Sequence, residues 1–204
     1  MKGDNANSIP LPTASPVPGT TEIDPARDLK NSMGLLSAEY SSVKIPSGFV
    51  EIYNEDGTIW TKFFFGDLAA KHSTDNALAP FRASSDGYLI FDLIGEGKGF
   101  YKVIANEETG LVKYIRKDDP SFKRQRWQEY ILSCFAVSAL DKTNSVRISP
   151  DGQHFKEYLD RSYIQFEPLE IEGDWLKVKV NDNTDGWIKW RINGKLAISL
   201  FETA

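Results

Sequence analysis

The chain has 204 residues, of which 41% are hydrophobic and 26% are charged, and these proportions are typical of globular proteins. They exclude a wholly disordered chain, a coiled coil and a collagen-like fibre. The net charge of −5 argues against a surface that follows nucleic-acid phosphates. No apolar run reaches the roughly 18–20 residues that cross a bilayer. We therefore expect no nucleic-acid partner and no transmembrane segment.

The N-terminal segment is rich in Pro, Ser, Thr and Asn, and residues 1–28 contain few large apolar side chains. Such a stretch cannot bury enough surface to offset the entropy lost on ordering. We predict a disordered Pro/Ser-rich tether over residues 1–44, with a short helix at Leu29–Tyr40 as a further expectation. The tether is either a frayed terminus or a spacer that follows a lipid-anchored cysteine. Because no signal peptide is present, two locations stay open: the cytoplasm, or the cell envelope after removal of a signal and with an anchor upstream of Met1.

Short aromatic or β-branched runs begin near Gly48 and alternate with turn residues. Phe49–Tyr53 and Thr58–Phe65 flank a turn that contains Asp56-Gly57, which predicts a β-hairpin. Further strands are predicted at Tyr88–Leu93, Phe100–Ala105, Leu111–Ile115, Phe135–Leu140, Tyr163–Phe166, Trp175–Val180, Gly186–Trp190 and Leu196–Phe201. Many short, closely spaced strands favour small barrels or sandwiches.

One predicted helix interrupts the strands. Asp118-Asp119-Pro120-Ser121 offers a helix cap and an initiating proline, and Phe122–Leu132 contains no glycine and no further proline. Its apolar residues follow roughly helical spacing. We therefore predict a linker helix within residues 119–133.

An internal repeat is the most informative feature of the sequence. Phe81–Gly87 resembles Val146–Gly152, and Phe100–Tyr114 resembles Trp175–Trp190 if one residue is inserted before Gly186. In this alignment Phe100 and Leu111 stand where the second copy has Trp175 and Trp187, and both Gly110 and Gly186 follow a turn. Period two places Leu176, Val178 and Val180 on one face of their strand, and Trp175, Lys177 and Lys179 on the other.

The second copy carries a recognisable pattern. Asp174-Trp175-Leu176-Lys177-Val178, followed by Gly186-Trp187-Ile188 and preceded by Val146-Arg147-Ile148-Ser149-Pro150-Asp151-Gly152, resembles the bacterial SH3-like domain family. The resemblance covers about residues 134–202, and residues 45–118 match it as a degenerate copy. It implies a mainly β chain of two tandem small SH3-like barrels, at 45–118 and 134–204, joined by the helix. It also implies a non-catalytic binding module of the bacterial cell envelope that recognises peptidoglycan peptides or a partner protein.

Little in the sequence points to catalysis. It contains no nucleophile elbow, P-loop or dinucleotide fingerprint. Cys134 is the only cysteine and lies in an apolar run, which is typical of a small buried hydrophobe. With His72 and His154 as the only histidines, a zinc site would depend on carboxylates. We expect no enzymatic activity, no cofactor and no metal.

The SH3-like resemblance also implies a binding groove between a long loop and the central strands of the second copy. There we expect Tyr158, Tyr163 and Trp175 to bind the ligand, since Tyr and Trp give large contact areas at low entropic cost. If this groove is not the site, the interface between the barrels, with Tyr114 and Pro120–Leu132, is the next candidate. Two other functions stay open: an inhibitor or interaction factor that acts through an exposed barrel edge, and an accessory domain of a cell-wall hydrolase system.

Overall fold

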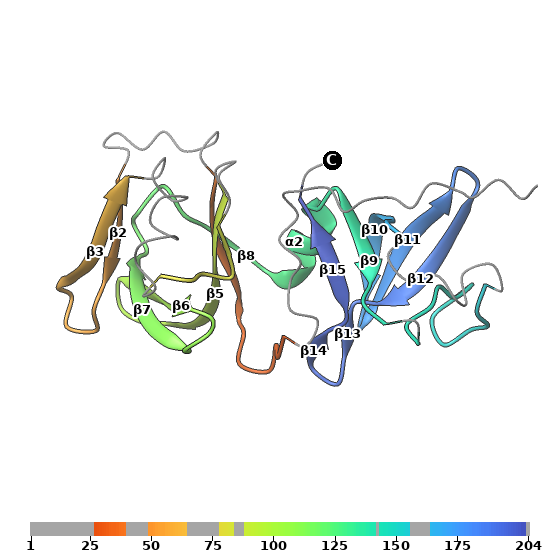
Figure 1. Cartoon of the computed structure of the whole chain (residues 1–204), viewed down its shortest axis with the longest axis horizontal. Coiled ribbons are helices and arrows are strands. Elements are labelled where there is room, and N and C mark those ends of the chain that lie inside the picture. Colours follow the sequence, from red (N-terminus) through yellow and green to blue (C-terminus); the bar gives the residue numbers. More distant parts are fainter. Residues whose placement is uncertain are drawn as a thin grey trace, which may run out of the picture.

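The computed structural model describes residues 27–39, 49–64, 78–83, 88–141, 143–155 and 164–202, and strands dominate these ranges (Figure 1). One α-helix, α2 at Trp127–Ser133, lies among them. The mainly β fold class is therefore confirmed. The strands are β1 Gly34–Glu39, β2 Phe49–Tyr53, β3 Ile59–Phe64, β4 Arg82–Ala83, β5 Tyr88–Glu96, β6 Phe100–Asn106, β7 Leu111–Arg116, β8 Lys123–Gln125, β9 Ala136–Ala139, β10 Glu167–Glu172, β11 Trp175–Asn181, β12 Thr184–Lys189, β13 Arg191–Ile192, β14 Lys195–Leu196 and β15 Ile198–Phe201.

The N-terminal half forms an antiparallel eight-stranded sheet in the order β3-β2-β7-β6-β5-β1-β8, with β4 paired to β5. The predicted hairpin at Asp56-Gly57 is confirmed as β2–β3, and Gly57 adopts a φ of 82°, which a side chain would disfavour. The C-terminal half contains three smaller sheets, β10-β11-β12, β13-β14 and β15-β9. Among the described strands, none of these sheets closes into a barrel.

Strand β1 corrects the N-terminal prediction. Gly34–Glu39 lies within the segment expected to be a tether or a short helix, yet it pairs with β5 along its whole length and with β8. The helix predicted at Leu29–Tyr40 is therefore wrong. Leu35 and Leu36 are both fully buried because each face of the strand is covered, so the strand shows no alternation of polar and apolar residues. Residues 1–26 of the predicted tether lie outside the described ranges.

Helix α2 begins later than the helix predicted within residues 119–133. Lys123–Gln125 forms β8, whose residues pair with Leu35–Ser37 of β1, and α2 begins only at Trp127. The backbone N–H of Arg126 donates to Glu129 Oε2 at 2.8 Å, which satisfies one unpaired group at the helix start. The cap predicted at Asp118–Ser121 is thus not the one used, because the residues after it, Lys123–Gln125, pair with β1 instead of starting a helix.

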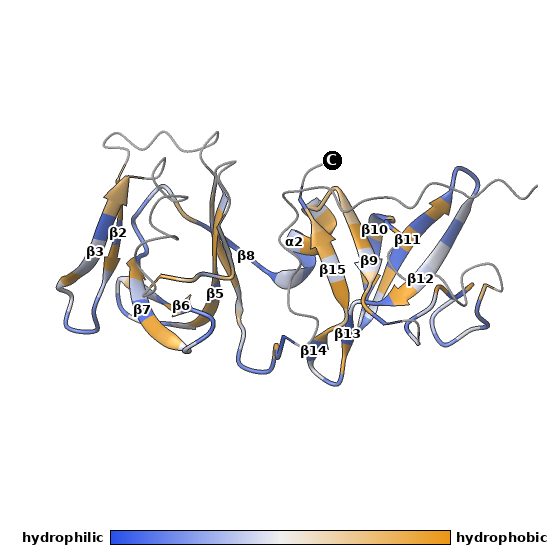
Figure 2. Cartoon of the chain, in the orientation of Figure 1, coloured by the Kyte–Doolittle hydropathy of each residue, from blue (hydrophilic) through white to orange (hydrophobic). Residues whose placement is uncertain are grey.

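Two hydrophobic cores lie on opposite faces of the same two strands. Leu36, Leu89 and Phe91 belong to the core of the N-terminal sheet, whereas Leu35 and Ile90 belong to a core that continues into α2 and the C-terminal half. Figure 2 shows the C-terminal pair β9 and β15 as mostly hydrophobic. Strands β1 and β5 therefore join the two halves through packed side chains. No helix in the described part of the chain is long and apolar enough to cross a membrane.

The repeated hairpins, β6–β7 and β11–β12, share one irregularity. The register shifts between Ile104 and Asn106 in the first hairpin and between Lys179 and Asn181 in the second. These are corresponding positions of the repeat, and both lie immediately before the turn. A shared β-bulge at one position is a specific backbone feature, so it supports the relation between the copies.

Beyond the turn, the pairing corrects the sequence alignment. Lys102 lies opposite Tyr114, and Lys177 lies opposite Trp187. Tyr114 therefore corresponds to Trp187 rather than to Trp190, so the first copy retains an aromatic residue at this place. Gly186 follows the turn, as expected, and is tightly packed. It lies in β12, where a Cβ would collide with Val146 Cγ1 and come within 2.8 Å of Val180 Cγ2.

Candidate functional site

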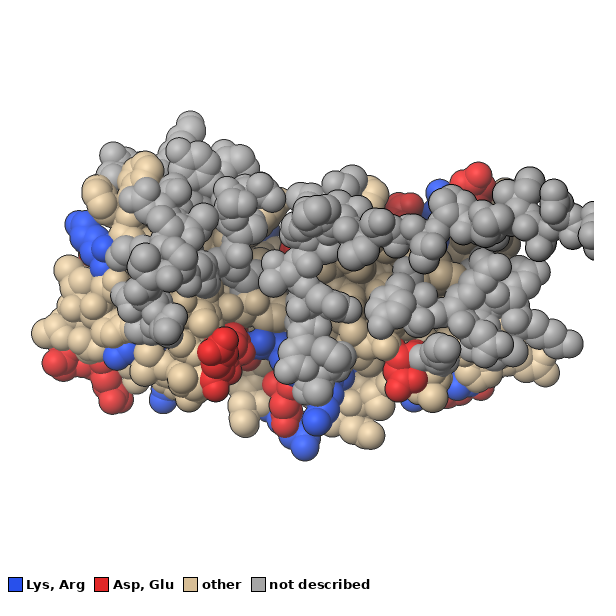
Figure 3. Space-filling model, in the orientation of Figure 1, with Lys and Arg blue, Asp and Glu red and all other residues tan. Residues whose placement is uncertain are grey.

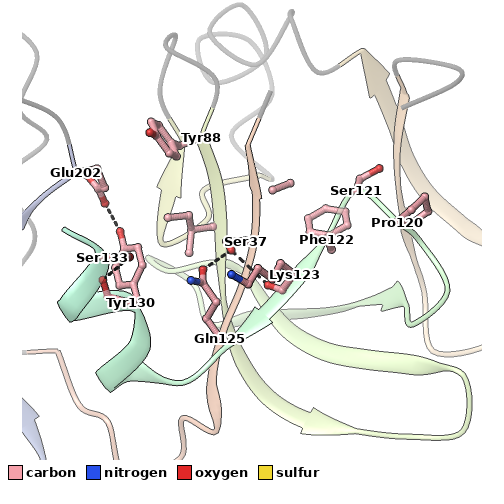
Figure 4. A pocket seen from close by; sticks show the side chains of 12 residues that line it. Ser37, Tyr88, Pro120, Ser121, Phe122, Lys123, Gln125, Tyr130, Ser133 and Glu202 are labelled. Atoms are coloured by element: carbon pink, nitrogen blue, oxygen red, sulfur yellow. Dashed lines mark hydrogen bonds between the residues drawn. The ribbon is translucent and has the colours of Figure 1, made fainter. Parts of the chain in front are cut away.

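A pocket of about 350 Å³ lies where the N-terminal sheet meets α2 and the C-terminal end of the described chain (Figure 4). Its lining comes from five parts of the chain: β1, its neighbour β5, the segment around β8, helix α2, and the residue after β15. The lining residues are Ser37, Ala38, Tyr88, Ile90, Pro120, Ser121, Phe122, Lys123, Gln125, Tyr130, Ser133 and Glu202.

Sheet register explains why these residues meet. Ser37 lies opposite Ile90 on one side and Lys123 on the other, so all three share the face that looks away from the N-terminal core. Further along the same face, Leu35 packs in the core that contains α2. Ala38 and Phe122, which pack with the N-terminal core, also line the pocket.

Hydrogen bonds hold the polar walls in place. Ser37 Oγ donates to Gln125 Oε1 at 2.6 Å, and Ser133 Oγ donates to the Tyr130 carbonyl at 2.7 Å. The Tyr130 hydroxyl donates to Glu202 Oε1 (Figure 4). The lining therefore offers fixed hydroxyl and amide groups, one lysine and one carboxylate. The described lining residues include neither histidine nor cysteine, which are the usual partners of an activated hydroxyl nucleophile.

Arg27 ties the helix side of the junction to the sheet. Its guanidinium donates to Asp92 Oδ2 at 2.7 Å and to Glu107 Oε2 at 2.8 Å. Ser32 Oγ donates to the other oxygen of Asp92 at 2.5 Å and accepts from Trp127 Nε1 at 2.7 Å. Burial raises the pKa of Glu107 above its ordinary value, although the Arg27 guanidinium pulls it down. The network links β5 to α2 through charge-assisted bonds, which are the stronger kind.

The backbone beside Arg27 also contacts the C-terminal half. Leu196 N–H donates to the Arg27 carbonyl at 2.9 Å, and Leu29 N–H donates to the Gly194 carbonyl at 2.7 Å. Sequence analysis missed this role because residues 27–30 were assigned to the tether. Arg27 gave no local signal for it, because its partners Asp92 and Glu107 lie far from it in the sequence.

Of the three residues predicted to bind a ligand, the structure describes only Trp175. Tyr158 and Tyr163 lie outside the described residues. Trp175 is only 8% exposed, and Lys189 Nζ and Arg147 Cζ lie 4.9 and 5.6 Å from its ring centre. It does not line the pocket. The alternative site was expected between the two halves. Of its residues, Pro120, Phe122 and Tyr130 line the pocket, whereas Tyr114 does not.

Cys134 and His154, the other groups considered from the sequence, both contact neighbouring residues of the fold. Cys134 is 6% exposed and packs in the C-terminal core, which confirms its predicted burial. The hydroxyl of Ser145 is hydrogen-bonded to His154 Nδ1. Within the described ranges, no group of three or more His, Cys, Asp or Glu side chains could hold a metal ion. Acidic and basic side chains are intermixed on the face shown in Figure 3.

No protein-family model, curated protein or solved structure matches this chain.

Proposed function

We propose that the chain is a non-catalytic binding module that holds a short peptide, foremost a peptide of peptidoglycan, in the pocket between its two halves. The observation that carries this proposal is the size and lining of the pocket. Its volume of about 350 Å³ lies near the lower end of the roughly 300–1,000 Å³ typical of small-ligand sites. A standard protein partner instead covers about 800 Å² on each side, so a few residues of peptide fit the space better.

The lining suits the chemistry of such a peptide. Hydroxyl and amide groups of Ser37, Ser121 and Gln125 can pair with peptide N–H and C=O groups. Lys123 complements a carboxylate, and Glu202 complements an amine. Peptidoglycan peptides carry both kinds of charge, and Tyr88 and Phe122 add apolar surface for their side chains.

The SH3-like assignment and the place in the cell envelope belong to the same proposal. The shared bulge before Asn106 and Asn181 supports two related units, and the pattern around Trp175 supports the SH3-like family. We propose an envelope location because peptidoglycan is found there.

Cosedimentation with purified peptidoglycan tests this function. We expect the parent chain to sediment, and Lys123→Glu to weaken binding about tenfold or more because a charge-assisted bond is lost. Lys98→Glu is the matched control, since this exposed lysine makes the same charge change outside the pocket lining. Equal sedimentation of the two variants, both with the melting temperature of the parent, would contradict the pocket as the site.

A second candidate is an interaction or inhibitor factor that acts through a sheet edge. Strand β3 is the end strand of the eight-stranded sheet, and its Ile59 and Phe64 are 52% and 39% exposed. Unpaired edges with apolar side chains are templates for pairing with another chain. For this candidate, Ile59→Lys should abolish capture of a protein partner from envelope extract while leaving sedimentation with peptidoglycan unchanged.

A further inference from the structure

Trp175 lies on the outer face of the sheet β10-β11-β12, as the period-two pattern predicts. Leu176 and Val178, on the same strand, are fully buried in the C-terminal core, whereas Trp175 does not belong to that core. It is nevertheless almost covered. Lys189, its register partner on β12, places Nζ 4.9 Å from the ring centre, and Arg147 places Cζ 5.6 Å from it.

Arg147 is held in position by its own loop. Its backbone pairs with Trp187 in both directions at 2.8 Å, and its Nη1 donates to the Gly152 carbonyl at 3.0 Å. The intervening turn is tight, because Asp151 has a φ of 57° and a Cβ on Gly152 would collide with Ser149 Oγ. The guanidinium is therefore oriented before any ligand arrives, which lowers the entropic cost of binding.

Arg147 also differs from the other arginines. Each other arginine whose side chain is described has a carboxylate partner: Arg27, Arg116, Arg124, Arg126 and Arg191. Among the described residues, no carboxylate pairs with Arg147 or with Lys189. Within the described ranges, two half-buried cations thus approach one indole ring from the β12 side without a counter-charge. An anion there would relieve their mutual repulsion and gain charge-assisted bonds.

We infer that Arg147, Lys189 and Trp175 form a second binding site, which takes a carboxylate such as the C-terminal carboxylate of a peptide. The planar fork of arginine matches the two oxygens of a carboxylate, Lys189 adds a second charge, and the indole ring holds both cations beside each other. This site is separate from the pocket, since none of its three residues lines that pocket. The inference does not depend on the proposed function.

The first copy of the repeat provides a natural comparison. There Phe100 occupies the place of Trp175 and lies opposite Arg116, which occupies the place of Lys189. Arg116 is neutralised by Asp118 at 2.6 Å. The inferred site is thus present in the second copy alone, and Arg116→Gln is a matched control for charge removal.

Indole N–H signals in NMR spectra of the ¹⁵N-labelled full chain test the inference, with the Trp175 signal assigned from Trp175→Phe. The probe is N-acetyl-alanyl-alanine, compared with its C-terminal amide and with inorganic phosphate at constant ionic strength. We expect a saturable shift of the Trp175 signal with the free carboxylate alone. Arg147→Gln and Lys189→Gln should each weaken this binding at least about tenfold, and Arg116→Gln should leave it unchanged.

The inference would be overturned by an equal shift with the amide, by a larger shift with phosphate, or by full binding in both glutamine variants. Lys189→Gln keeps the test decisive if Arg147→Gln does not fold. Loss of the shift in Lys123→Glu, together with its retention in Arg147→Gln, would assign the carboxylate to the pocket instead and also overturn the inference.

Discussion

Leu35 and Leu36 are neighbours on β1, and each points into a different hydrophobic core with no exposed surface. Leu35 packs in the core that includes Trp127 and Ile131 of α2, and Leu36 packs in the core of the N-terminal sheet. Because one rigid strand contributes to both, disturbing either core affects the other. The two halves are therefore expected to unfold together, although the repeat would suggest two independent units.

The first prediction concerns this coupling. Leu35→Ala and Leu36→Ala should each destabilise the chain by about 2–5 kcal/mol, the usual cost of a large-to-small change in a core. Both should shift one common transition in urea, followed by circular dichroism and by tryptophan fluorescence. Leu132→Ala on α2 is the control, since Leu132 is 41% exposed. Two separate transitions, each moved by only one of the core variants, would contradict the coupling.

The second prediction concerns Glu107 and pH. Burial raises its pKa above the ordinary 4.5, so as pH rises past 4.5 the unfolded chain releases this proton before the folded chain does. Linkage then makes stability fall with rising pH in this window. Glu107→Gln should remove this decline, so its stability relative to the parent should increase from pH 4 to pH 7.

The control for that experiment has the opposite sign. Lys117 lowers the pKa of Glu96, so the stabilising contribution of Glu96 is present above pH 4.5 and is lost as pH falls. Glu96→Gln should therefore match the parent at low pH and be less stable near neutrality. Parallel pH profiles for the two variants would show that the assigned Glu107 environment is wrong.

The third prediction concerns Gly186. Its backbone approaches Val146 and Val180 so closely that a Cβ has no room, and overpacking of this kind costs about 1–3 kcal/mol. Gly186→Ala should lower the free energy of unfolding by that amount. At Gly97 nothing lies within 4 Å of an added Cβ, so Gly97→Ala should be neutral. Equal stability of the two variants would show that Gly186 is not tightly packed.

The fourth prediction concerns Cys134. Because its thiol is buried in the C-terminal core, modification of the native thiol should be slow and should accelerate only under conditions that unfold the chain. The rate can be followed with a chromogenic disulfide reagent at increasing urea concentration. Rapid modification in buffer alone would refute the packing around α2.

Local patterns predicted local structure well. The β2–β3 hairpin follows from Asp56-Gly57 between two apolar runs, and the outward orientation of Trp175 follows from period two. Patterns failed where distant segments decide the outcome. Lys123–Gln125 lies just before helix α2 in the sequence, but it forms a strand because it pairs with β1.

The candidate site shows the same limit. Ser37, Tyr130 and Glu202 meet in one pocket, although they are far apart in the chain and none belongs to a recognisable motif. Sequence reasoning reached the interface between the halves only as an alternative, through Pro120–Leu132. It could not anticipate the pocket because the strand that forms its floor, β1, was assigned to a tether.

The central claim is that a peptide occupies the pocket between the halves, and methyl NMR tests it most directly. Ile90 and Ala38 line the pocket, whereas Val103 and Val178 are buried elsewhere in the two cores. Titration of the ¹³C-methyl-labelled full chain with soluble peptidoglycan stem peptides should shift the Ile90 and Ala38 signals saturably and leave the two valines unmoved. Methyl signals of Ile90 and Ala38 that stay in place at millimolar peptide would contradict the claim.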